Sequence, residues 1–229
     1  LVFAAALAFT GCDSAGEPSP DPPAGPVAPP TMADVGGYPV QLDGRWGFMD
    51  AQGRLRGEPA FDFADEVHGG LAAIRQGTQW GYARPDGAVA VAPAFRAAGR
   101  FTGPLAPVRT DAGWGFIDAA GNPVGAADYD AALSFSGGYA PVRRGALWGY
   151  VDATGAEAVS PQFSAAGPFV NGLAPVETPS GWRFVDPAGA FASDATYAEA
   201  RAFSDAGLAP VREAGSDAWK FADAGGAIV

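Results

Sequence analysis

Residues 139–155 read YAPVRRGALWGYVDATG, and closely related stretches recur along most of the 229-residue chain. The repetition is clearest in the six tryptophans, which are separated by 34, 34, 34, 34 and 37 residues: Trp46, Trp80, Trp114, Trp148, Trp182 and Trp219. A sequence period of this length indicates a repeat protein, in which each unit buries its apolar side chains by stacking on its neighbours.

Two further columns of residues follow the tryptophans. Phe or Tyr stands two residues after every Trp, and Gly stands seven residues after it, at Gly53, Gly87, Gly121, Gly155, Gly189 and Gly226. Asp precedes most of these glycines by three residues, at Asp50, Asp118, Asp152, Asp186 and Asp223. The pattern Asp-x-x-Gly is typical of a type I turn, because the Asp carboxylate accepts hydrogen bonds from the turn amides. We interpret both columns as structural.

The alternation of side chains in residues 148–152 predicts a β-strand with two unlike faces. Trp148, Tyr150 and Asp152 share one face, and Gly149 and Val151 share the other. Glycine weakens a strand unless a ring or a backbone must approach it closely. We therefore predict that the tryptophans pack between successive β units and are not exposed docking groups.

These features predict an all-β fold. Each unit of about 34 residues is expected to form a three-stranded antiparallel meander, with a Leu-Ala-Pro-Val strand, the Trp strand and a third strand such as residues 88–92. About six units fit between residues 35 and 229, and we expect them to form an open curved or superhelical array. The alternative is a closed six-bladed β-propeller.

The unit Gly-Leu-Ala-Pro-Val, followed by a turn and Trp-Gly-Tyr-Val-Asp, resembles the bacterial WG repeat over residues 38–229. The resemblance implies a β-rich repeat domain of bacterial proteins whose biochemical roles are mostly undefined. Trp182-Arg183 and Trp219-Lys220 replace Trp-Gly in the last two copies. We expect those copies to be distorted or to act as caps.

The N-terminal segment predicts where in the cell the protein is located. Residues 1–11 are apolar and end in small residues before Cys12, which is typical of a signal peptide, here N-terminally incomplete. Residues 9–12 resemble the bacterial lipobox, which implies lipidation of Cys12. Residues 12–34 form a Pro-rich linker. We expect an extracytoplasmic protein of the bacterial cell envelope that contacts the membrane through the lipid anchor only; an ordinary secretory signal is the alternative.

Charge and composition exclude several functions. The chain has 14 basic and 25 acidic residues and a net charge of −11, which disfavours nucleic-acid binding. One Cys and one His, His68, cannot build a disulfide or a two-histidine metal site. No catalytic sequence motif is present, so we expect neither an enzyme nor a cofactor.

The candidate binding residues form a column after each first strand: Arg75, Arg109, Arg143 and Arg212. If aligned, these arginines could bind carboxylates on a protein or an envelope polysaccharide. The alternative is that they are solvated and paired with the abundant acids. A non-periodic cluster of Asp62, Asp65 and Glu66 near His68 is interpreted as a solvated loop.

Taken as a whole, the sequence favours a cell-envelope lipoprotein that presents a non-enzymatic β-repeat domain for binding or scaffolding. An envelope glycan-binding protein and a purely structural envelope component are alternatives. A glycan hydrolase is a further alternative, which would need two carboxylates outside the repeat pattern at a common cleft.

Overall fold

The computed structural model describes residues 37–229, which form strands, turns and connecting segments and contain no helix. The predicted signal peptide, Cys12 and the whole linker lie outside the described residues. No helix long and apolar enough to cross a membrane occurs in this part of the chain.

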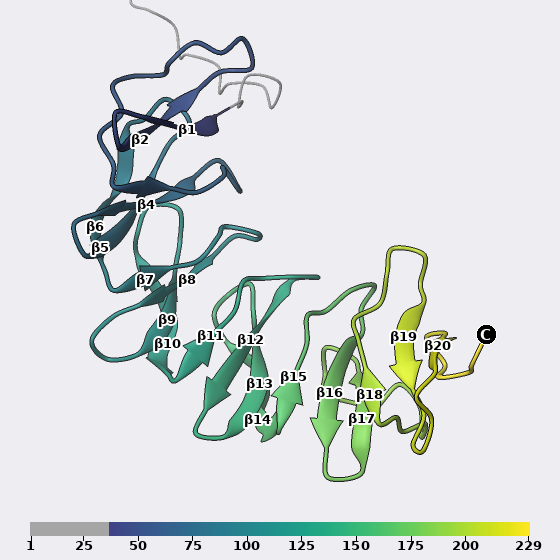
Figure 1. Cartoon of the computed structure of the whole chain (residues 1–229). Helices are drawn as coiled ribbons and strands as arrows, with labels where there is room; N and C mark the ends of the chain where they lie inside the picture. Colours follow the sequence, from purple (N-terminus) through teal and green to yellow (C-terminus); the bar gives the residue numbers. More distant parts are fainter. Residues whose placement is uncertain (1–36) are drawn as a thin grey trace, which may run out of the picture.

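The strands form six antiparallel sheets in chain order (Figure 1). The first contains β1 (Tyr38–Leu42) and β2 (Arg45–Met49), and the second contains β3 (Phe63–Ala64), β4 (Ala72–Gln76), β5 (Gln79–Ala83) and β6 (Val89–Phe95). The third contains β7 (Ala97–Ala98), β8 (Ala106–Arg109), β9 (Trp114–Ile117) and β10 (Pro123–Tyr129). The fourth contains β11 (Ala131–Ala132), β12 (Tyr139–Arg144), β13 (Leu147–Asp152) and β14 (Glu157–Phe163). The fifth contains β15 (Ala165–Ala166), β16 (Ala174–Thr178) and β17 (Gly181–Val185), and the sixth contains β18 (Glu199–Ala200), β19 (Ala209–Arg212) and β20 (Trp219–Ala222).

This architecture confirms the predicted all-β class and the tandem antiparallel repeats. Figure 1 shows the six sheets along an open arc, with β1 and β2 at one end and β19 and β20 at the other. The array is therefore open, and the closed six-bladed propeller is not formed.

One element was missing from the predicted meander. A two-residue strand, such as β7, pairs with the Leu-Ala-Pro-Val strand of every sheet after the first. In the second sheet, β6 ends at Phe95 and the chain enters the third sheet at Ala97. The chain passes in the same way from the third sheet to the fourth and from the fourth to the fifth. Two alanines carry no strand signal of their own, so this strand depends on its pairing with a neighbour.

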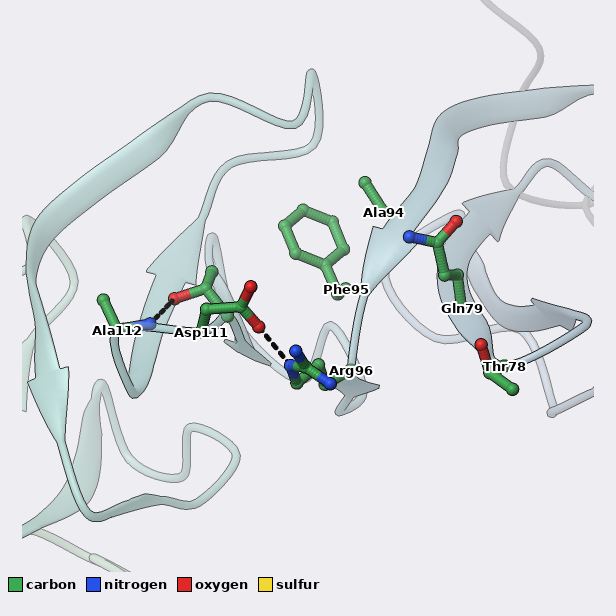
Figure 2. Close-up of a pocket in the computed structure, with 8 residues that line it drawn as sticks. Thr78, Gln79, Ala94, Phe95, Arg96, Asp111 and Ala112 are labelled. Atoms are coloured by element: carbon green, nitrogen blue, oxygen red, sulfur yellow. Dashed lines mark hydrogen bonds and ion pairs between the residues drawn. The ribbon is translucent and has the colours of Figure 1, made fainter.

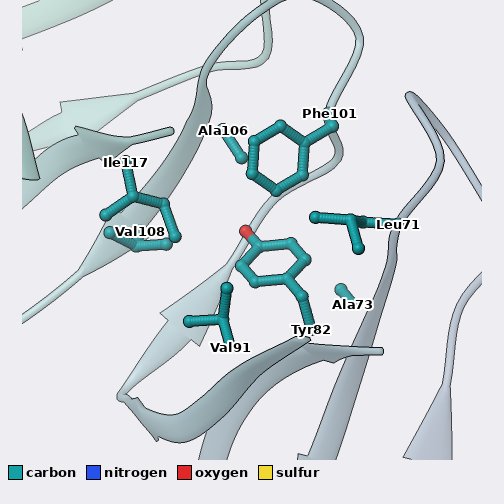
Figure 3. Close-up of a cluster of buried hydrophobic side chains, with 8 residues drawn as sticks. All are labelled: Leu71, Ala73, Tyr82, Val91, Phe101, Ala106, Val108 and Ile117. Atoms are coloured by element: carbon teal, nitrogen blue, oxygen red, sulfur yellow. The ribbon is translucent and has the colours of Figure 1, made fainter. Parts of the chain in front are cut away.

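The core lies between the sheets because each sheet has two apolar faces. The aromatic face carries the Trp and the aromatic residue two positions later, and the valine face carries Ala and Val or Ile from the preceding strand. Tyr82 on the aromatic face of the second sheet packs with Val108 and Ile117 on the valine face of the third (Figure 3). Five such clusters fill the five contacts between the six sheets.

The tryptophans border this core and do not fill it. In the first five repeats the buried ring is the one two residues later, as in Phe48, Tyr82 and Tyr150. The first five tryptophans are half-buried, and the side chain of Trp219 is 41% exposed. The indoles stand at the ends of the strands beside the hairpin turns, where a neighbouring sheet covers them only in part.

The glycine after Trp is explained by the third strand. A Cβ atom added to Gly149 would lie 2.6 Å from the backbone nitrogen of Pro161 in β14, and at Gly81 the corresponding distance to Pro93 N is 2.7 Å. Arg183 and Lys220 replace this glycine in the fifth and sixth sheets, and neither sheet has a third long strand. The first sheet keeps the glycine as Gly47 and also has no third long strand, so the missing strand does not follow from the replacement alone.

We expect Gly149→Ala to lower the free energy of unfolding by about 1–3 kcal/mol, because the added methyl group forces β14 away from β13. Gly225→Ala is the matched control, since its Cβ would meet only Asp223 Oδ1 at 3.4 Å. Chemical denaturation of both variants measures the difference. Equal stabilities would contradict this account of the Trp-Gly pair.

Candidate functional site

The periodic aspartates are held inside their own turns. Asp50 Oδ1 accepts hydrogen bonds from the backbone N–H groups of Gln52 (3.0 Å) and Arg54 (2.8 Å). Asp118, Asp152, Asp186 and Asp223 repeat this two-amide arrangement. The glycine that closes each turn has a positive φ, as at Gly155 (80°), which favours glycine. These carboxylates lie in separate turns and do not converge on one another.

Hydrogen bonds of this kind also lower the pKa values of three of these carboxyl groups. The N–H of Arg54 holds the pKa of Asp50 below its ordinary value, and the side chains of Asn122 and Thr154 do the same for Asp118 and Asp152. Hydrogen bonds to the ionised form are the physical cause in each case.

We expect the fold to lose stability in acid because these carboxyl groups have lower pKa values in the folded chain than in the unfolded chain. The unfolded chain binds more protons as the pH falls, so their contribution is complete above the ordinary Asp pKa of 3.8 and is lost progressively below it. Unfolding temperatures recorded from about pH 6 to about pH 2 measure the effect. Asp118→Asn should make the unfolding temperature depend less on pH. A stability that does not change over this pH range would contradict the stabilising role of the turn carboxylates.

The candidate arginines stand beside the tryptophans. Cross-strand pairing places Arg75 opposite Trp80, Arg109 opposite Trp114, Arg143 opposite Trp148 and Arg212 opposite Trp219. Directly opposed residues share a face of the sheet. The guanidinium carbons of Arg75 and Arg143 lie 5.9 Å and 5.8 Å from the ring centres of Trp80 and Trp148. These distances correspond to cation–π contacts, which hold the two guanidinium groups in place.

The four arginines differ in their ionic partners. Arg212 pairs with Glu199 and lies 3.7 Å from Asp217. Within residues 37–229, Arg75, Arg109 and Arg143 form no ion pair, and the Nε atoms of Arg75 and Arg143 are shielded from solvent without a hydrogen-bond partner. Three consecutive sheets therefore present a cation without an acidic partner at the same register position.

A cavity of about 610 Å³ opens between the hairpin turns of the second and third sheets (Figure 2). Its lining is formed by Thr78, Gln79, Ala94, Phe95, Arg96, Thr110, Asp111 and Ala112. Arg96 and Asp111 form an ion pair across it. A second cavity of about 240 Å³ lies on the other side of the same turn and includes Arg109 and Trp114 in its lining. The turn at residues 110–112 separates the two.

The larger cavity lies beside Phe95, which is half-buried, whereas Phe61, Tyr129, Phe163 and Tyr197 in the same column are buried. Arg144 occupies the position of Thr110 in the next sheet, where its guanidinium lies 4.8 Å from the ring centre of Tyr129 and pairs with Asp128 (3.0 Å) and Glu157 (2.7 Å). Thr178 stands at this position in the fifth sheet, so a short side chain there does not by itself open a cavity.

Sequence reasoning missed Phe95, Arg96 and Asp111. A signal was available in the columns, because the second and fourth sheets carry Asp and Gly at the positions of Arg96 and Asp111: Asp62 with Gly77 and Asp130 with Gly145. There the Asp carboxylate accepts a hydrogen bond from the glycine amide, as between Asp130 and Gly145 (2.6 Å). Two changes at partnered positions replace that contact with a side-chain ion pair at the rim of the cavity.

The acidic cluster near His68 joins two sheets. Both carboxylate oxygens of Asp65 accept hydrogen bonds of 2.8 Å from the guanidinium of Arg100. This contact lowers the pKa of Asp65. Glu66 lies 3.5 Å from His68 Nε2. The part of the chain that the structure describes contains no group of three or more His, Cys, Asp or Glu residues arranged to hold a metal ion.

An open stack of short antiparallel sheets, each built around a Trp-Gly strand, defines a β-repeat protein. The family model described as WG containing repeat matches residues 46–77, 80–112, 114–148, 148–178 and 182–215. The chain belongs to this family. The matches cover five repeats, and the structure forms a sixth sheet at residues 199–222.

Among solved structures, the fold is similar to a chain of "Dihydro-heme d1 dehydrogenase NirN in complex with DHE", with 11% sequence identity and a TM-score of 0.45. The likeness covers 86% of this chain and 51% of that chain, so this chain spans about half the length of that protein. No curated protein matches the sequence.

Proposed function

We propose that this protein is a bacterial cell-envelope lipoprotein, anchored through Cys12, whose WG-repeat domain binds a carboxylate-bearing partner without catalysing a reaction. The apolar residues 1–11 and the small residue before Cys12 support the anchor, and the Pro-rich residues 13–34 supply a tether. The proposed location of the protein is extracytoplasmic.

The proposed binding function rests on the row formed by Arg75, Arg109 and Arg143. Each guanidinium has five N–H donors and no acidic partner within residues 37–229, although the chain is strongly acidic overall. Stacking on Trp80 and Trp148 fixes two of them before a ligand arrives. A guanidinium that is already oriented loses less entropy when it binds a carboxylate through two parallel hydrogen bonds.

The cavity between the second and third sheets favours an acidic polysaccharide as the partner. It combines the partly exposed ring of Phe95 with the polar side chains of Gln79, Thr110 and Asp111. An apolar ring surrounded by a few hydrogen-bonding groups suits a sugar, which has an apolar face and polar edges. Arg109, in the lining of the adjoining cavity, could then bind a carboxylate on the same polymer.

We expect the triple variant Arg75→Gln, Arg109→Gln, Arg143→Gln to remain folded and to lose at least about tenfold in affinity for its carboxylate-bearing partner, because each charged hydrogen bond contributes about 1.5–3 kcal/mol. Affinity capture from native envelope with the unmodified chain supplies the partner, and titration calorimetry compares the variants.

A charge-matched variant with Gln at Arg54, Arg84 and Arg201 serves as the control, since these three residues are exposed and lie outside the row. It should bind as the unmodified chain does. Equal affinity of both triple variants for the captured partner would refute the arginine row as its binding site.

A separate measurement tests the anchor. We expect Cys12→Ser, made in the chain expressed with its complete N-terminal signal, to move the protein from the membrane fraction to the soluble extracytoplasmic fraction, because the residue that carries the lipid is lost. Fractionation with metabolic labelling by a fatty acid reports both effects. Unchanged membrane association and labelling would exclude Cys12 as the lipid site.

A further inference from the structure

Within residues 37–229, no further sheet covers the aromatic face of the sixth sheet. In the first five sheets the aromatic residue two positions after Trp is at most 4% exposed, because the valine face of the following sheet packs on it: Phe48, Tyr82, Phe116, Tyr150 and Phe184. The equivalent residue of the sixth sheet, Phe221, is 51% exposed, and Trp219 beside it is 41% exposed. This face has the composition of a buried contact surface and is partly exposed to solvent, with the guanidinium carbon of Arg201 4.4 Å from the ring centre of Trp219.

Within residues 37–229, no sheet covers the valine face of the first sheet either. It carries Tyr38, Val40, Leu42, Arg45, Gly47 and Met49, and the side chains of Tyr38 and Leu42 are 53% and 43% exposed. The later sheets have a fully buried alanine at the position of Tyr38. The second to fifth sheets have Gln or Thr or Arg at the position of Leu42. The first sheet is therefore more apolar at both positions, and Arg45, the charged residue on this face, pairs with Asp62.

We propose that the aromatic face of the sixth sheet docks on the valine face of the first sheet of a second copy of this chain. These are the same two faces that meet in all five contacts between sheets within the chain. Val40 and Gly47 keep the residue types that form the centre of the valine face in the inner repeats. The intermolecular contact thus continues an interface that the protein already builds five times.

Tyr38 compensates for a difference between the internal and the intermolecular contact. Inside the chain, Tyr82 packs against Phe101, which lies between β7 and β8 of the third sheet, with a distance of 4.9 Å between the ring centres. Ala106 lies next to Phe101 in the same cluster (Figure 3). Within residues 37–229, the first sheet has no strand equivalent to β7 and no counterpart of Phe101. Tyr in place of Ala offers Phe221 an aromatic ring from the strand itself.

The resulting contact is heterologous, since two different faces meet. Because the array is an open arc, a repeated contact of this kind adds copies at both ends and forms chains of molecules. This inference rests on the terminal sheets and is independent of the arginine row. It would give the protein a scaffolding role at the membrane surface.

The test uses the full chain with Cys12→Ser, which removes the lipid site. Sedimentation velocity should show a mass that rises with concentration and exceeds that of a dimer. Tyr38→Arg blocks one face and Phe221→Arg blocks the other, so each variant alone should be monomeric. An equimolar mixture of the two should form a one-to-one dimer and nothing larger, because each variant retains one complementary face.

Leu133→Arg is the matched control, since Leu133 is 47% exposed and lies on neither terminal face; it should associate as the parent does. Circular dichroism and thermal unfolding verify the fold, and Tyr38→Ala with Phe221→Ser replaces the charged pair if either arginine variant is unfolded. A parent chain that stays monomeric up to about 1 mM overturns the proposal. Dimers of Tyr38→Arg alone, or a mixture that remains monomeric, overturn it too.

Discussion

Face-to-face stacking of thin sheets is the constraint on which this protein depends. No sheet is wide enough to hold a core of its own, so each buries its aromatic face against the valine face of the next. The glycine after Trp allows the third strand to lie close to the Trp strand, as Gly149 does beneath β14. Hydrogen bonds from Tyr82 Oη to the Gly99 carbonyl and from Tyr150 Oη to the Gly167 carbonyl, both 2.8 Å, tie the sheets to the following connecting segments.

The stack leaves one edge of each sheet free to vary. The hairpin turns at this edge make few contacts with the core, so substitutions there change the surface and preserve the fold. Thr110 and Arg144 occupy the same register position in adjacent sheets; Thr110 lines a cavity, whereas Arg144 lies over the ring of Tyr129. Differences between repeats at these turns are therefore the most informative sequence positions for binding.

Charge is organised locally although the chain carries a net charge of −11. Many acidic side chains have defined partners: the turn aspartates accept backbone amides, and Asp65 binds Arg100 across two sheets. Arg212 follows the expectation that the arginines pair with acids, whereas Arg75 and Arg143 stack on tryptophan. An acidic protein can in this way keep a few cations available for an anionic ligand.

The sequence by itself determined the repeat length, the all-β class, the Trp-Gly strand and the Asp-x-x-Gly turns, because each depends on residues close together in the chain. Only the tertiary structure decided which aromatic ring becomes the core, since burial of Tyr150 and partial exposure of Trp148 depend on where the next sheet ends. The two-residue strands and the cavity beside Phe95 also required it. They arise from pairing and packing between neighbouring repeats, and a single repeat carries no local signal for such contacts.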